Sequence, residues 1–194
     1  FWPSQTNGSS AMMWVASHHP AAGLMAFLSR PSPVFIELAQ KVAVWNGTYT
    51  VTGAGSPLTT GVFSGLNFEA RARAWCIRSL AHSIFLTPDS HPWKTSAKTS
   101  LTQNVTALTA FTVDSKALLN LMWLGTPSSP SSQYNVKPTG AAFGTSSMQQ
   151  AFHLVEVHKA ASAGLLTGAD QTALETLADW MATWPARWIN EQPN

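Results

Sequence analysis

Two arginines, a tryptophan and a histidine recur in one stretch of the sequence at spacings that a helix would bring together. At about 100° per residue, four side chains fall within an arc of about 60°: Arg71, Trp75, Arg78 and His82. A guanidinium group donates paired hydrogen bonds to a carboxylate or sulfate, and an indole offers a flat apolar surface to a sugar ring. This face predicts a binding site for an anionic, sugar-like ligand. A structural role, in which arginine stacks on tryptophan beneath the surface, is an equally simple interpretation, and both stay open.

Two adjacent histidines form a second candidate. His18 and His19 precede Pro20, where a helix is expected to begin, and either imidazole could serve as a general base near neutral pH. Adjacent side chains in an extended segment point in opposite directions, so at most one of them would line a given site. The alternative is a histidine that bonds to the backbone at the helix entry.

No metal or cofactor is implied by the sequence. His153 and Glu156 are three residues apart, which is not the spacing of a zinc-binding HExxH motif, and no phosphate-binding glycine loop follows a strand. The one cysteine, Cys76, is expected to be an inert, buried thiol. The sequence therefore gives no basis for a redox or metal-dependent reaction.

Composition excludes several classes of partner. Charged residues make up only 10% of the 194 residues, and the net charge is +2. No lysine- or arginine-rich run provides the footprint of a nucleic-acid-binding protein, and no apolar run approaches the ~18 residues needed to span a membrane. Low charge and nine tryptophans favour a secreted or cell-surface protein, and Asn7, Asn46 and Asn104 stand in sequons that could accept glycans.

Apolar periodicity predicts an all-α fold in a single domain over residues 1–194. Helices are expected at 20–29, 33–47, 68–86, 91–112, 114–124, 146–166 and 170–190. Two irregular stretches, 49–66 and 125–145, separate them. Two helices are expected to meet at each of three junctions, 29–33, 87–91 and 167–170. At each junction, a pair of apolar residues ends the first helix, a helix-breaking residue follows, and a Ser or Asp can cap the second helix. The junctions predict three helical hairpins, 20–47, 68–112 and 146–190.

The faces of these helices indicate how they pack. In 68–86 the side opposite the arginines is apolar, and in 170–190 one stripe is apolar, so each should bury one face. In 146–166, Met148 and Val155 belong to one apolar side and Leu154 and Leu165 to another. That helix is expected to lie buried between two layers.

Three segments resemble blocks of large bacterial proteins of uncharacterised function. They are the His19-Pro20 to Leu38 segment, the Arg71 to Pro92 segment with its Trp75-Cys76-Ile77-Arg78 run, and the segment from Ser147 onwards. Such proteins look like relatives of α/α-toroid carbohydrate-active enzymes, including six-hairpin glycosidases and alginate- or heparin-type lyases. The resemblance implies a partial toroid or solenoid of helical hairpins. A full toroid needs about twelve helices, so the chain would be part of a larger ring.

The resemblance and the residues together imply glycan binding or processing by an exported bacterial protein, with an acidic polysaccharide as partner. If the protein is an enzyme, β-elimination suits the residues best. Arg71 or Arg78 would neutralise a uronate carboxylate, and His18 or His19 would take the C5 proton. The alternative is a non-catalytic structural or surface-assembly domain, whose helices pack against further copies or against the rest of a longer chain.

Overall fold

The computed structural model describes residues 21, 23–49, 70–112 and 147–183. All regular structure in these ranges is helical: α1 (Leu24–Ser29), α2 (Pro33–Tyr49), α4 (Ala70–Leu86), α5 (Pro92–Thr112), α6 (Ser147–Ser162) and α7 (Gly168–Ala182). The all-α prediction is confirmed for this part of the chain. The expected helix 114–124, nearly all of the two irregular stretches and the end of 170–190 lie outside the described residues.

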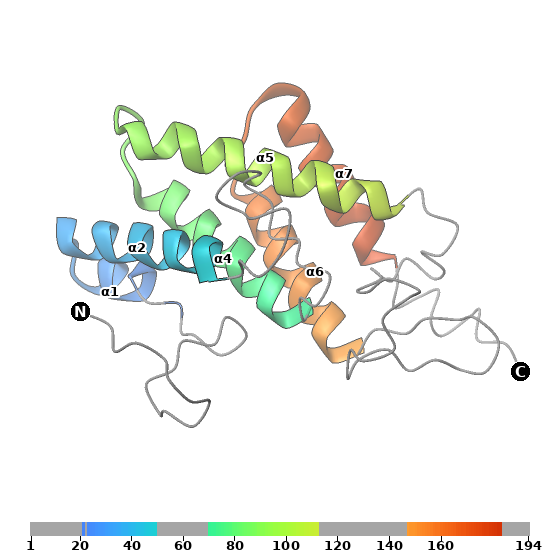
Figure 1. The fold of residues 1–194 in the computed structure, drawn as a ribbon, viewed down its shortest axis with the longest axis horizontal. Helices are drawn as coiled ribbons and strands as arrows, with labels where there is room; N and C mark the ends of the chain where they lie inside the picture. Colours follow the sequence, from blue (N-terminus) through green and yellow to red (C-terminus); the bar gives the residue numbers. More distant parts are fainter. Residues whose placement is uncertain (1–20, 22, 50–69, 113–146, 184–194) are drawn as a thin grey trace, which may run out of the picture.

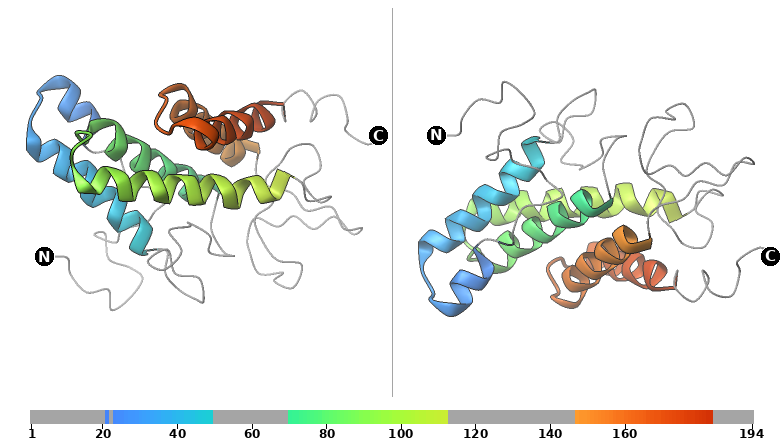
Figure 2. Two further views of the ribbon diagram at one scale, coloured as in Figure 1. Left: turned by 90° about the horizontal axis from the view of Figure 1, so that it is seen from above. Right: turned by 90° about the horizontal axis from the view of Figure 1, so that it is seen from below.

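The helices pack as consecutive pairs. Helix α1 packs on α2, α4 on α5 and α6 on α7. Neighbouring pairs are joined by contacts of α2 with α4, of α4 with α6 and of α5 with α7. Figures 1 and 2 show α1 and α2 at one end of the array, α6 and α7 at the other, and α4 and α5 between them. Helix α4 therefore contacts helices of all three pairs.

Prolines begin two of the helices, as predicted. Pro33 is the first residue of α2 and Pro92 is the first residue of α5, positions where the missing N–H would have had no partner inside the helix. At the start of α5, the Trp93 N–H donates to His91 Nδ1 over 3.1 Å. This histidine cap was not predicted.

The junction between α6 and α7 differs from the expected one. Helix α6 ends at Ser162, and α7 begins at Gly168, whose φ is 57°. Asp170 was expected to cap the second helix, but its carboxylate accepts a hydrogen bond of 3.1 Å from the hydroxyl of Thr102 on α5. Gln171 closes the turn, because its side chain accepts from the Leu166 N–H and donates to the Ala161 carbonyl.

A close backbone approach fixes α1 against α2. Gly23 precedes α1 with φ 96°, a conformation that side-chain-bearing residues rarely adopt. A Cβ atom there would lie 2.9 Å from the carbonyl oxygen of Phe35 and 3.1 Å from Ala39. Only glycine fits this position without movement of the backbone.

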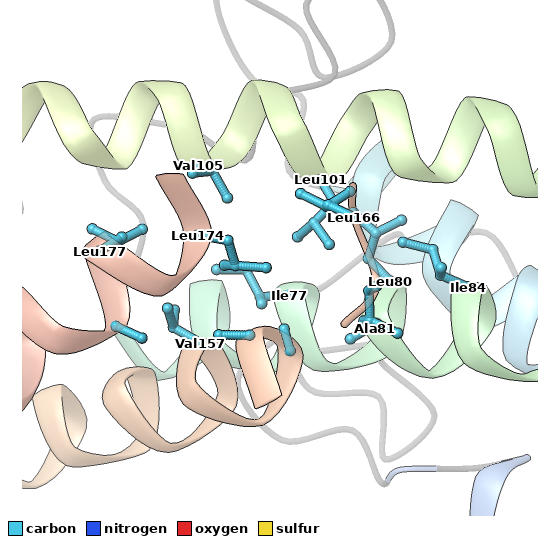
Figure 3. Close-up of a cluster of buried hydrophobic side chains, with 14 of the residues drawn as sticks. Ile77, Leu80, Ala81, Ile84, Leu101, Val105, Val157, Leu166, Leu174 and Leu177 are labelled. Carbon is cyan, nitrogen blue, oxygen red and sulfur yellow. The ribbon is translucent and has the colours of Figure 1, made fainter. Parts of the chain in front are cut away.

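One apolar core is enclosed by α4, α5, α6 and α7 (Figure 3). Helix α4 contributes the apolar side predicted from its periodicity, which is Ile77, Leu80, Ala81 and Ile84. Helix α7 contributes the predicted stripe of Leu174, Leu177, Ala178 and Met181, all of them buried. Trp180 packs against this core from its edge.

The prediction that 146–166 is buried on two apolar sides is correct for one side only. Ala161 and Leu165 of one predicted side are buried, and Leu154 packs against the core. On the other side, Met148 is 58% exposed and Val155 is 45% exposed. The buried part of α6 also includes Gln150, His153 and Val157. Helix α6 packs between α4 and α7, and this packing determines which of its sides is covered. The hydrophobicity of the side chains alone does not determine it, so polar residues can face α4.

Candidate functional site on helix α4

Trp75 and Arg78 of α4 form a stacked pair. The guanidinium carbon of Arg78 lies 4.0 Å from the centre of the Trp75 ring, which is cation–π geometry. The same indole contacts Phe152 of α6, with ring centres 5.1 Å apart and planes inclined by 50°. The predicted α4 face is therefore directed towards α6, and its aromatic member packs against an aromatic residue of that helix.

Arg78 lies near the carboxylate of Glu156 on α6. Burial lowers the pKa of Arg78, while the nearby charge of Glu156 acts in the opposite direction. Glu156 is 5% exposed, and its carboxylate forms an ion pair of 3.1 Å with Lys159 on the same helix. Glu156 is thus close to a basic residue of each helix, Arg78 of α4 and Lys159 of α6.

His82 continues the same flank of α4 by one turn. Burial, followed by the positive charges of Arg78 and Lys159, lowers the pKa of its imidazole to about 4. The ring is therefore neutral at physiological pH and a weak proton acceptor. It can donate or accept a hydrogen bond, but it is poorly tuned to act as a general base near neutral pH.

The four predicted residues of α4 share an intermediate degree of burial. Arg71, Trp75, Arg78 and His82 are all half-buried, and none belongs to the apolar core. Trp75, Arg78 and His82 are associated with residues of α6, whereas a cleft beside Trp75 stays a prediction. His18 and His19 lie outside the described residues.

A second polar group, which sequence reasoning did not identify, lies deeper at the same boundary. Gln150 and His153 of α6 are fully buried, and Arg73 of α4 is 5% exposed. Burial lowers the pKa of Arg73 to about 10. Burial, followed by the charge of Arg73, lowers the pKa of His153 to about 3. Neither ring nitrogen of His153 has a hydrogen-bond partner in the described part of the chain.

The buried polar residues correct one expectation and confirm another. Cys76 is fully buried, and burial raises the pKa of its thiol, so the prediction of an inert cysteine is confirmed. The side chains of Asn46 and Asn104 are also buried, and their amide groups donate to Ser79 and to the Ser100 carbonyl, respectively. These two sequons are therefore not accessible to a glycan in the folded protein, and Asn7 lies outside the described residues.

The described ranges contain neither a cluster of metal ligands nor a helix suited to crossing a membrane. No three histidine, cysteine, aspartate or glutamate side chains gather there in an arrangement that could hold a metal ion. None of the described helices combines the length and hydrophobicity that crossing a membrane requires. Comparisons of the chain with protein-family models, with curated proteins and with solved structures find no match.

Proposed function

We propose that the chain is a non-catalytic assembly domain whose α1–α2 hairpin docks against another protein surface. The observation that carries this proposal is a set of five large, exposed apolar side chains on the hairpin: Met25, Leu28, Val34, Leu38 and Val44. Three of these five are more than 60% exposed. The three on α2 fall within an arc of about 120° around that helix. Exposed apolar residues gathered on one surface, rather than scattered singly, are typical of interaction sites.

The geometry of α4 favours assembly over catalysis. The Trp75 ring is contacted by Arg78 and by Phe152, so part of the surface on which a sugar could stack is already used inside the protein. The two imidazoles described at the α4–α6 boundary, His82 and His153, have lowered pKa values. They are therefore poor candidates for taking a proton from a substrate at neutral pH.

The arrangement of the hairpins fits the same proposal. Pairs that contact only their neighbours are the basis of a solenoid or partial toroid, in which terminal units expose apolar surface unless something covers them. We infer that the described helices form such an array and that the α1–α2 pair lies at its open end. On this proposal the protein is exported and assembles at the cell surface.

Site-specific photo-crosslinking tests the proposal. A benzophenone side chain placed at Val34 should crosslink to a protein in the cells that make the chain. The same group at Val155, which is also exposed and apolar but lies on α6, should not. Equal crosslinking at both positions, or none at either, would contradict a docking role for the α1–α2 hairpin.

Binding of an acidic polysaccharide is a second candidate, favoured by the basic residues that the facing helices α4 and α6 place near Glu156. Arg71, Arg78 and Lys159 lie on the facing helices α4 and α6, and the pKa of Arg78 responds to the charge of Glu156. We infer a uronate carboxylate as the preferred ligand group, because a guanidinium group can bind it through two hydrogen bonds. His18 or His19 would then be the base of a lyase reaction.

Titration of the folded protein with alginate, heparin and neutral oligosaccharides tests this candidate. Arg78→Ala should weaken binding to uronate-containing chains about tenfold and binding to neutral chains much less. Arg30→Ala is the control, because Arg30 is exposed at the end of α1, far along the chain from α4. If none of the three glycans binds at millimolar concentration, the assembly proposal stands alone.

A further inference from the structure

The solvent-facing side of α2 has an internal symmetry. Its exposed residues include two valines, Val34 and Val44, and two opposite charges, Glu37 and Lys41. The other side of the helix, which includes Ala39, Val42 and Asn46, is buried. The exposed side is therefore a continuous surface directed away from α4.

The positions of these residues are related by a half-turn. Val34 and Val44 lie five residues before and after the level of Ala39, and Glu37 and Lys41 lie two residues before and after it. At about 100° per residue, the members of each pair fall on opposite sides of the midline of the exposed face. A two-fold axis that is perpendicular to α2 at the level of Ala39, and that lies parallel to the exposed face just outside it, therefore brings each residue to the level of the other member of its pair in a second copy.

Building on the proposed function, we propose that the partner on this face is a second copy of the chain, bound through antiparallel packing of α2 on α2. The rotation places Val34 against Val44 of the partner subunit and Glu37 against Lys41 of the partner subunit. Each contact occurs twice, as in any interface formed by the same surface on both subunits. The interface thus joins four valines and two interchain ion pairs.

The charges favour a second copy over an unrelated protein. Within one chain the Glu37 carboxylate and the Lys41 ammonium group are 3.8 Å apart, and their side chains are 65% and 78% exposed. An ion pair so exposed contributes little to the stability of a single chain. In the antiparallel pair, the same two groups become partly sheltered and meet opposite charges across the axis. An unrelated partner would have to present a positive charge opposite Glu37 and a negative charge opposite Lys41, at the same spacing.

Charge reversal tests the pairing. Sedimentation velocity over a range of concentrations should show a dimer of the purified protein. Lys41→Glu and Glu37→Lys should each weaken it by about tenfold or more, because each places like charges opposite one another twice. Mixing the two variants should restore association, since one copy then carries only positive and the other only negative charge at positions 37 and 41.

Cysteine pairing tests the register. In the proposed dimer position 34 lies opposite position 44, whereas two copies of either position are about 15 Å apart along the helices. Disulfides form at Cα separations of about 4.4–6.8 Å. A mixture of Val34→Cys and Val44→Cys proteins should therefore form a disulfide-linked dimer, and neither variant should do so alone. Cys76 is buried and does not interfere.

The controls separate this inference from the proposed function. Asp179→Lys reverses an exposed charge on α7 and should leave the dimer unchanged. A purified chain that is monomeric at all concentrations and gives no mixed disulfide would overturn the inference. If the Val34 photo-crosslink nevertheless captures a protein of a different mass, the docking role of the hairpin stands. If that crosslink is also missing, both proposals fail.

Discussion

Asn46 of α2 donates a hydrogen bond of 2.9 Å to the Ser79 hydroxyl of α4, and both side chains are buried. The Ser79 hydroxyl in turn donates to the Trp75 carbonyl over 2.8 Å. These two hydrogen bonds connect the buried side of α2, through Ser79, to the backbone of Trp75. Because a buried amide without a partner is costly, this link helps to fix the register of α2 on α4.

Ser79→Ala should lower the free energy of unfolding by about 1–3 kcal/mol, since it removes one hydrogen-bond partner of a buried amide. Urea unfolding followed by circular dichroism measures the change. Thr176→Ala is the matched control, because that hydroxyl also bonds to a carbonyl four residues earlier but is exposed. The control should change stability by less than about 0.5 kcal/mol. Equal losses in both variants would show that the Asn46 contact is not the cause.

Trp75→Leu and Arg78→Met should show coupled effects on stability. A cation–π pair of this geometry contributes about 0.5–2 kcal/mol, depending on how far it is shielded from water. The double variant should therefore lose less free energy than the sum of the two single variants by about that amount. Strict additivity in the urea unfolding series would contradict an energetic role for the stack.

The lowered pKa of His153 predicts that the protein loses stability in acid. Its folded-state pKa of about 3 lies below its ordinary value of 6.5, because of burial and the charge of Arg73. Between these two values the unfolded chain binds one more proton than the folded chain does at this residue. The free energy of unfolding should therefore fall by about 1.4 kcal/mol per pH unit from this group as the pH drops below 6.5. His82 acts in the same direction.

His153→Leu should remove that part of the pH dependence. At neutral pH the variant should be as stable as the parent or more so, because the buried ring nitrogens have no hydrogen-bond partner among the described residues to lose. His158→Gln, at an exposed position of the same helix, is the control and should leave the slope unchanged. Unfolding curves measured from neutral pH to about pH 4.5 would decide the matter.

Gly23→Ala should destabilise the protein more than Gly164→Ala does. Both glycines have positive φ, so alanine costs roughly 1–2 kcal/mol of backbone strain at either site. A Cβ atom at position 23 also meets the Phe35 carbonyl at 2.9 Å, whereas the space beside Gly164 is open. Thermal unfolding of the two variants compares them directly. A lower melting temperature for the position 164 variant would refute the importance of the close approach.

Local rules were sufficient for the helix class and for several of its boundaries. Proline has no N–H to lose at the first position of a helix, so the starts at Pro33 and Pro92 followed from the residues themselves. The apolar side of α4 followed from periodicity, because Ile77 and Leu80 recur at helical spacing. Such features depend on neighbours along the chain.

The features that were not predicted depend on contacts between distant segments. Gln150 and His153 are polar and fully buried, while Met148 is apolar and exposed, so hydrophobicity identified only one of the buried parts of α6 and added a side that faces solvent. The contact between Trp75 and Phe152 joins residues on different helices and leaves no pattern in either segment. The stacking of arginine on tryptophan could be stated beforehand only as one of two alternatives.

The central place of α4 has a kinetic consequence. Because this helix packs against α2, α5 and α6, few native contacts between the hairpins can form before it is in position. Replacement of a buried α4 residue such as Ile77 should therefore slow folding, whereas replacement of Leu177, on a helix at the edge of the array, should mainly accelerate unfolding. The order in which the three hairpins assemble is thus set by the middle one.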